Sequence, residues 1–168
     1  KPQEHLPLIS NLLERISGAK HFTKIDLRGA YNLVRIRPGD EWKTAFRTQY
    51  GHFVYIVVPL GLTNAPAVFQ HMANDIFWDF LDIFLIIYLD DLLTYSKMQE
   101  EHDIHVQKAL ERLLRKYGLY VNLEKCSFDC KQVEFLAYTI SSKGIFMDPA
   151  KVQRNIGMTT TTFDGHSS

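Results

Sequence analysis

The sequence contains little cysteine, which excludes the class of small domains held together by disulfide bonds. Cys126 and Cys130 are the only two cysteines among 168 residues, and they lie close together in the chain. A pair so close cannot link distant parts of a domain, and no second pair of Cys or His residues follows at zinc-ligand spacing. We therefore expect free thiols and no zinc site.

The chain also lacks a long hydrophobic run and a net charge. Its longest strongly apolar run, at 83–89, is far shorter than the about 20 residues that cross a bilayer, so we expect no membrane association. Lysine plus arginine equals aspartate plus glutamate at 19 each, but basic residues dominate 20–47 and acidic residues dominate 75–103. Opposed blocks suit a site for a polyanion and cations, although solvated surfaces produce them too.

The residues that are present predict one globular domain. The chain is 46% hydrophobic and 12% aromatic, which excludes disordered and collagen-like classes and provides for a real core. Helical periodicity predicts helices at 8–16, 69–80 and 106–117, the second entered through Asn64 and the third through a Ser96–Gln99 capping box. Alternating or continuous apolar runs predict strands at 21–27, 33–36, 44–48, 53–58, 83–88, 92–95, 119–121, 133–140 and 145–147.

These elements predict an α+β fold with an antiparallel or mixed sheet backed by helices. Residues 44–48 and 53–58 form a hairpin in this prediction, and its nearly all-apolar second arm is expected to be buried on both faces. A second hairpin joins 83–88 to 92–95, with two acidic residues at its tip.

Three aspartates are the candidates for chemistry. Asp90 and Asp91 follow a strongly apolar run, where two carboxylates repel each other and lose hydration unless a cation meets them. Asp26 ends another apolar segment, and if the two strands are neighbours the three carboxylates converge at one end of the sheet. Such a set suits Mg²⁺ and phosphoryl transfer. The alternative, which the residues alone leave open, is ordinary turn chemistry.

Four segments resemble the successive motifs of reverse transcriptases of gypsy-class LTR retrotransposons, over about residues 5 to 153. They are KIDLRGAYN from Lys24, LGLTNAPAVFQ from Leu60, YLDD from Tyr88 and VEFLAYTIS from Val133. The resemblance implies a polymerase palm fold with only a partial fingers region, and RNA-directed DNA polymerase activity. It implies that Asp26, Asp90 and Asp91 are the catalytic acids and bind two Mg²⁺ ions, for which Mn²⁺ can substitute.

The resemblance also implies roles for other positions. Tyr31, Leu60, Gly61 and Asn64 match nucleotide-binding positions, and Phe135, Leu136, Ala137 and Tyr138 match the primer grip. Without the family, Tyr31 reads as a core aromatic, 59–66 as a helix entry, and 133–140 as core strands. Lys43 and Arg47 are weaker candidates for template phosphates, since exposed cations usually face water. His102 and His105 share a helix face, for which a solvated surface is favoured over metal binding. Trp42 and Trp78 could stack on bases, but core or partial burial is the commoner arrangement.

The expected partners are an RNA or DNA template, a primer and deoxynucleoside triphosphates, within a parent polyprotein that also carries protease, ribonuclease H and integrase. We expect a lead-in helix with partial fingers at 1–20, a palm at 21–153, and a weakly structured tail outside the family at 154–168. We expect the family pattern to be truncated at both ends, and Ala137 replaces its usual glycine. The alternative is an inactive retroelement remnant that at most binds nucleic acid or a partner chain.

Overall fold

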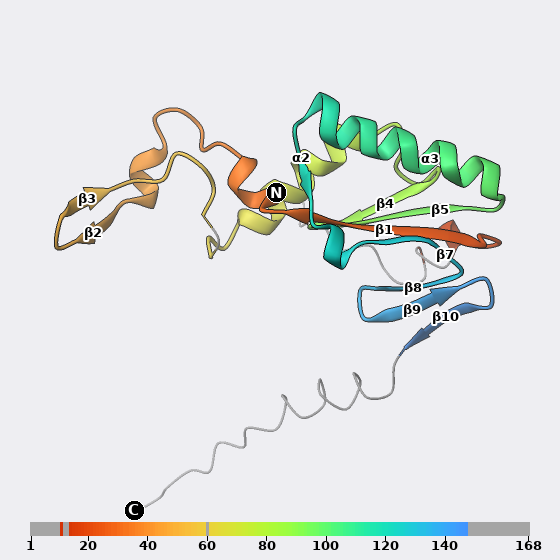
Figure 1. The fold of residues 1–168 in the computed structure, drawn as a ribbon. Helices are drawn as coiled ribbons and strands as arrows, with labels where there is room; N and C mark the ends of the chain where they lie inside the picture. Colours follow the sequence, from red (N-terminus) through yellow and green to blue (C-terminus); the bar gives the residue numbers. More distant parts are fainter. Residues whose placement is uncertain (1–10, 12–13, 60, 148–168) are drawn as a thin grey trace, which may run out of the picture.

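The centre of the molecule is a five-stranded sheet. The computed structural model describes residues 11, 14–59 and 61–147. The strands β4 (Leu85–Tyr88), β5 (Asp91–Ser96), β1 (His21–Arg28) and β6 (Tyr120–Val121) lie in that order, and β7 (Ser127–Cys130) also pairs with β1 (Figure 1). Every named pair is antiparallel, which is the first of the two arrangements, antiparallel or mixed, that the sequence left open.

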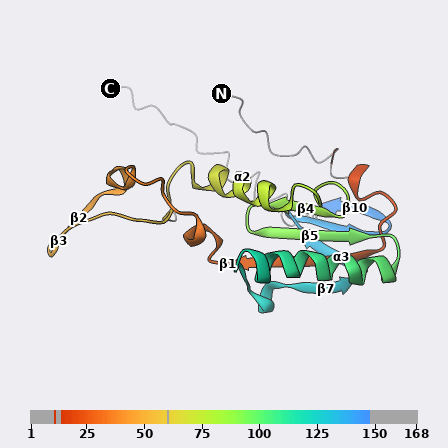
Figure 2. The same ribbon diagram turned by 90° about the horizontal axis from the view of Figure 1, so that it is seen from above.

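Helices cover one face of this sheet and a small second sheet covers the other. The helices are α2 (Ala65–Phe77) and α3 (Gln99–Glu111), and the second sheet has the order β10 (Gly144–Met147), β9 (Tyr138–Ser141), β8 (Gln132–Phe135). Figure 1 shows α3 and the second sheet on opposite sides of β1, and Figure 2 shows α2 and α3 from above. The α+β prediction is therefore confirmed.

Alternation along β1 creates these two cores. Ile25 and Leu27 pack into one buried cluster with α2, whereas Phe22 packs into another with Val133 and Phe135 of β8. Successive side chains of a strand point to opposite faces, so residues 22, 24 and 26 share the face of the second sheet. The one strand thus contributes to both cores and leaves Asp26 at its end on the side away from the helices.

The N-terminal capping of α2 and α3 differs from the capping that the sequence predicts. Asn64 is the N-cap residue of α2, but it acts through its carbonyl, which accepts a hydrogen bond from Val68 N, and its side chain makes no capping bond. The predicted Ser96–Gln99 capping box is wrong, because Met98 is the N-cap residue of α3. The Ser96 hydroxyl instead reaches the imidazoles of His102 and His105, at 3.0 and 2.8 Å.

The end of α3 is joined to the end of α2 by an ion pair. A π-helical turn at Arg112–Lys116 extends α3 until Gly118, whose φ of 62° ends it. The Arg112 guanidinium pairs with both carboxylate oxygens of Asp79 and lies over the Phe80 ring at 3.7 Å. These contacts fix α3 against the segment that follows α2.

The predicted buried hairpin is exposed, which corrects the sequence prediction. Its strands, β2 (Phe46–Thr48) and β3 (Gly51–Phe53), extend away from the main sheet (Figure 1). No described element covers it, so Phe53, Val54, Tyr55 and Ile56 are all more than 40% exposed, whereas Val58 is buried. The apolar run at 53–58 is therefore not a strand that is buried on both faces.

Other segments differ less. The predicted strand at 33–36 is a single bridge between Arg35 and Val57, preceded by a 3₁₀ turn at Ala30–Leu33. Further 3₁₀ turns lie at Glu41–Thr44 and Leu123–Lys125, and β7 was not predicted.

Of the predicted helix at 8–16, the structure describes Asn11, Glu14 and Arg15 as helical, and the predicted tail at 154–168 lies outside the described residues. Within the described part, no helix is long and apolar enough to span a bilayer.

Candidate active site

Sheet pairing brings the predicted acids together. Asp26 in β1 lies directly opposite Asp91 in β5, and Leu27 N donates a 2.9 Å hydrogen bond to the carbonyl of Asp90. Residues paired across antiparallel strands share a face, so the Asp26 and Asp91 side chains emerge on the side away from α2 and α3. The prediction that these distant strands are neighbours is confirmed.

Gln70 of α2 holds the turn that carries Asp90. The turn joins β4 to β5 through Leu89 and Asp90, with Leu89 at a φ of 52°. The Gln70 side-chain oxygen accepts a 2.7 Å bond from Leu89 N, and its nitrogen donates to Ile87 O at 3.2 Å and to Asn74 Oδ1 at 2.9 Å. Gln70 is therefore a positioning residue. The sequence pattern predicts that Gln70 lies on a helix but indicates no role for it.

Asp91 lies in an environment that opposes its charge. Burial raises the pKa of Asp91; the Lys24 ammonium, whose Nζ lies 3.5 Å from Asp91 Oδ2, acts in the opposite direction, and the carboxylates of Asp90 and Asp26 raise the pKa further. The site therefore gathers more negative charge than the nearby lysine balances. Lys24 was not predicted to take part, although its spacing from Asp26 places both side chains on one face.

The backbone around Asp26 is fixed on its other edge by the segment before β7. Asp26 O accepts a 2.9 Å hydrogen bond from Asn122 N, and Asp26 N lies 3.4 Å from the Cys126 Sγ, which in turn donates to Asn122 O. Burial raises the pKa of the Cys126 thiol, so this thiol is a protonated packing group. Asp26 itself is only 8% exposed, which gives its carboxylate little access to bulk water.

The donor set fits a hard divalent cation. Asp26 and Asp91 contribute carboxylate oxygens from paired positions, and Asp90 precedes Asp91 in the chain, which is the ligand chemistry that Mg²⁺ prefers. Within the described part of the chain, no three side chains of the ligand types are already gathered around a common point. The backbone thus brings the acids together, while binding would require their side chains to turn toward a shared ion.

The predicted nucleotide-binding positions are described only in part. Gly61 has a φ of 104°, a conformation that favours glycine, and Asn64 begins α2. The backbone of Tyr31 lies in the 3₁₀ turn that follows β1, with its side chain outside the described residues, and Leu60 is also outside them. A hollow of about 500 Å³ lies beside this end of β1, lined by Arg28, Val121, Asn122, Leu123 and Glu124.

The predicted primer grip is a tight hairpin. Phe135 pairs with Tyr138, and the two residues between them, Leu136 and Ala137, have φ values of 52° and 65°. Two positive φ angles are typical of a two-residue hairpin turn that matches the twist of its strands. The Phe135 side chain is buried in the core, so it supports the hairpin. Tyr138 is half-buried.

The weaker predictions lie apart from the acids. Lys43 pairs with Asp40 at 2.7 Å and Arg47 lies in β2, both in the part of the chain that carries the projecting hairpin. Trp42 and Trp78 are 67% and 75% exposed, so the expectation of partial burial is wrong for both.

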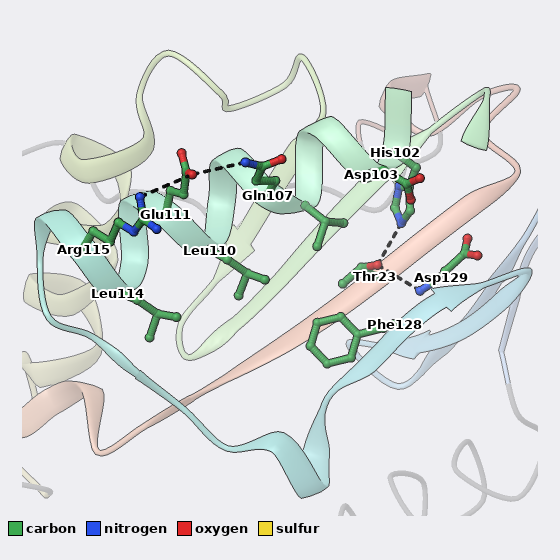
Figure 3. A pocket seen from close by; sticks show the side chains of 11 residues that line it. Thr23, His102, Asp103, Gln107, Leu110, Glu111, Leu114, Arg115, Phe128 and Asp129 are labelled. Atoms are coloured by element: carbon green, nitrogen blue, oxygen red, sulfur yellow. Dashed lines mark hydrogen bonds and ion pairs between the residues drawn. The ribbon is translucent and has the colours of Figure 1, made fainter. Parts of the chain in front are cut away.

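The two helix histidines correct another prediction. His102 is 1% exposed, with Nε2 2.8 Å from the Thr23 hydroxyl, and His105 stacks on the Phe84 ring at 4.1 Å. The helix turns them toward β1 and β5, so the predicted solvated face is wrong. A hollow of about 570 Å³ lies beside His102, between α3 and β7 (Figure 3). It faces the helix side of β1 and contains none of the three aspartates.

Comparisons with known proteins show the family of this chain. The family model described as reverse transcriptase (RNA-dependent DNA polymerase) matches residues 1–140. The chain belongs to the reverse transcriptase family. It is 45% identical over 139 residues to the Transposon Tf2-3 and Tf2-4 polyproteins of Schizosaccharomyces pombe (strain 972 / ATCC 24843). These alignments cover 83% of this chain and 10% of each polyprotein, so the chain spans about a tenth of the length of these relatives.

Solved reverse transcriptases have the same fold. The foamy viral protease-reverse transcriptase in complex with dsDNA aligns with a TM-score of 0.76 at 22% identity, covering 96% of this chain and 33% of that one. The native prototype foamy virus protease-reverse transcriptase aligns with a TM-score of 0.70 at 26% identity, covering 83% and 19%. The palm-type sheet is therefore the fold of this family, whose members use divalent metal ions.

Proposed function

We propose that this chain is the palm of an RNA-directed DNA polymerase. It would extend a primer 3′-hydroxyl with deoxynucleoside triphosphates, copying an RNA or DNA template. The observation that supports this most is the pairing of Asp26 with Asp91, beside the turn that carries Asp90, in a chain of the reverse transcriptase family. A cluster of acids at one end of a palm sheet suits phosphoryl transfer assisted by metal ions.

In this proposal Asp26, Asp90 and Asp91 hold two Mg²⁺ ions, or Mn²⁺ in their place. When bound, such a pair of ions promotes deprotonation of the primer hydroxyl and neutralises charge on the triphosphate. Asp26 is buried and Asp91 is half-buried, which limits competing water and strengthens their hold on a cation. Gln70 fixes the backbone of the Leu89 turn and thereby orients the two adjacent acids.

The remaining residues are proposed to align the substrates. Tyr31, Leu60, Gly61 and Asn64 border the incoming nucleotide, where the glycine permits a close backbone approach. The Leu136–Ala137 turn presents backbone to the primer end, supported by the buried Phe135. Lys43 and Arg47, both exposed, would contact template phosphates.

We also place this chain within a longer polyprotein that carries protease, ribonuclease H and integrase. Support comes from the Tf2 relatives, which are named as polyproteins, and from the foamy virus neighbours, which are named as joined protease and reverse transcriptase. The class of LTR element remains a prediction from the sequence.

A primer-extension assay on an RNA template with Mg²⁺ tests the proposed activity. Replacing Asp90 by Asn should lower incorporation at least about 100-fold, because several kcal/mol of charge stabilisation by the metal are lost. Asp75→Asn is the matched control, since Asp75 is an exposed acid on α2, and it should retain incorporation. Wild-type incorporation no higher than that of Asp90→Asn would contradict the proposal and favour the inactive remnant.

A further inference from the structure

Lys24 is the cation that accompanies the candidate metal ligands. Its Nζ lies 3.5 Å from Asp91 Oδ2, and both side chains are about three-quarters shielded from solvent. Lys24 lies two residues before Asp26 on β1, and its partner in β5 is Leu93, two residues after Asp91. The ammonium therefore emerges on the same sheet face as both acids, and approaches Asp91 diagonally across the two strands.

A lysine at this position has an electrostatic consequence. Ordinary surface lysines lie in water and contribute little to stability, but this one is shielded and pairs with a carboxylate that is itself half-buried. Because Asp26 and Asp90 lie beside Asp91, a metal-free site holds mutually repelling carboxylates. The Lys24 ammonium offsets part of that repulsion. It also attracts Asp91 Oδ2, an oxygen that a metal ion would need as a ligand.

We propose that Lys24 is a counter-ion for Asp91 that an incoming divalent cation must displace, so that Lys24 weakens metal binding while it stabilises the metal-free site. This inference rests on the proposed function, since it requires the acids to bind the metal. It also gives a physical reason why Asp26 and Asp91 are paired by the backbone, with Asp90 in the adjoining turn, while the described side chains are not gathered around one point: Asp91 is held by the lysine.

Metal binding without nucleic acid or nucleotide tests the inference. Mn²⁺ is titrated into the chain and the free ion is followed by its electron paramagnetic resonance signal. Lys24→Met should lower the dissociation constant by about tenfold, because a monovalent and a divalent cation that share one carboxylate repel each other strongly even when partly screened. Lys24→Arg, which keeps the charge, should bind Mn²⁺ as the wild type does.

Two controls separate this effect from a general change in charge. Lys108→Met removes the same charge from an exposed position of α3, and should leave Mn²⁺ binding unchanged. In an Asp91→Asn background, Lys24→Met should no longer tighten binding, because the shared ligand is absent. Thermal melting with and without Mn²⁺ provides a second measurement: Lys24→Met should melt lower than wild type without metal and gain more from it. Lys24→Gln replaces Lys24→Met if that variant does not fold.

The outcomes distinguish the two proposals. Asp26→Asn, titrated in parallel, reports whether Mn²⁺ binds at the acids at all. If Asp26→Asn abolishes binding but Lys24→Met binds Mn²⁺ no more tightly than the wild type, the role of Lys24 is overturned and the metal site stands. If none of the variants shows Mn²⁺ binding that depends on Asp26, the metal site is overturned, and the inference about Lys24 with it.

Discussion

Three non-glycine residues adopt left-handed backbone conformations at the two turns of the candidate active site. Leu89 precedes the paired acids, and Leu136 and Ala137 form the predicted primer grip, with φ values between 52° and 65°. Such conformations cost about 1–2 kcal/mol for residues that carry a Cβ atom. Strain at these turns fits positions where geometry is set by function as much as by stability.

Ala137 allows this strain to be measured. Ala137→Gly should increase the free energy of unfolding by about 1 kcal/mol, because glycine adopts a φ of 65° without the steric cost of Cβ. Urea unfolding monitored by circular dichroism measures the difference.

The control for this substitution has the opposite sign. Ala67 is exposed within α2, where Ala→Gly should decrease stability by about 1 kcal/mol, because glycine is a poor helix former. A destabilised Ala137→Gly protein would contradict the assignment of a left-handed turn at this position.

At the scale of elements, a buried polar network joins α3 to the sheet. His102 lies between the hydroxyls of Thr23 in β1 and Ser96 in β5, at 2.8 and 3.0 Å, and Ser96 also contacts His105. Nearby, His21 of β1 pairs with Asp129 of β7, next to Lys131. The network connects four elements, so protonation within it affects the attachment of the helix.

Stability should therefore fall in mild acid. Burial lowers the pKa of His102 below its ordinary 6.5, with Asp129 opposing and His21 adding to this effect, and burial likewise lowers the pKa of His105. Between the lowered pKa and 6.5 the unfolded chain binds protons that the folded chain does not. The free energy of unfolding then decreases as pH falls, by at most about 1.4 kcal/mol per pH unit for each histidine.

Denaturant unfolding at several pH values between 7.5 and 5 measures this dependence. His102→Gln should be less stable at pH 7.5 but show a shallower slope, whereas His52→Gln, at an exposed position of β3, should keep the wild-type slope. A slope that His102→Gln leaves unchanged would show that the buried imidazole is not its source.

Apolar periodicity in the sequence predicted helices and strands correctly where the apolar side chains of the pattern pack into the core. The periodicity of Phe69, Ala73 and Phe77 predicts α2 because these side chains do pack on the sheet. Predictions failed where tertiary contacts decide: His102 is buried because two hydroxyls satisfy its ring, and the arm after Phe53 is exposed because no described element covers it. The strand β7 was missed because its four residues contain a single large apolar side chain, Phe128, which is too short a pattern to favour a strand.

At the scale of the whole molecule, the site depends on pairing between residues far apart in sequence. The chemistry of Asp26, Asp90 and Asp91 could be inferred from carboxylates after apolar runs, but their proximity could not. Family resemblance predicted that proximity, and the β1–β5 register supports it. Lys24, Gln70 and Cys126 were not assigned, because each acts through a contact that only the folded chain creates.

The central claim is that these distant carboxylates share divalent cations. The most direct measurement is anomalous diffraction from crystals of the chain grown with Mn²⁺, which locates the metal without reference to catalysis. We expect an anomalous peak between the carboxylate groups of Asp26 and Asp91, with Asp90 nearby. A well-occupied Mn²⁺ site elsewhere, with none between Asp26 and Asp91, would contradict the claim.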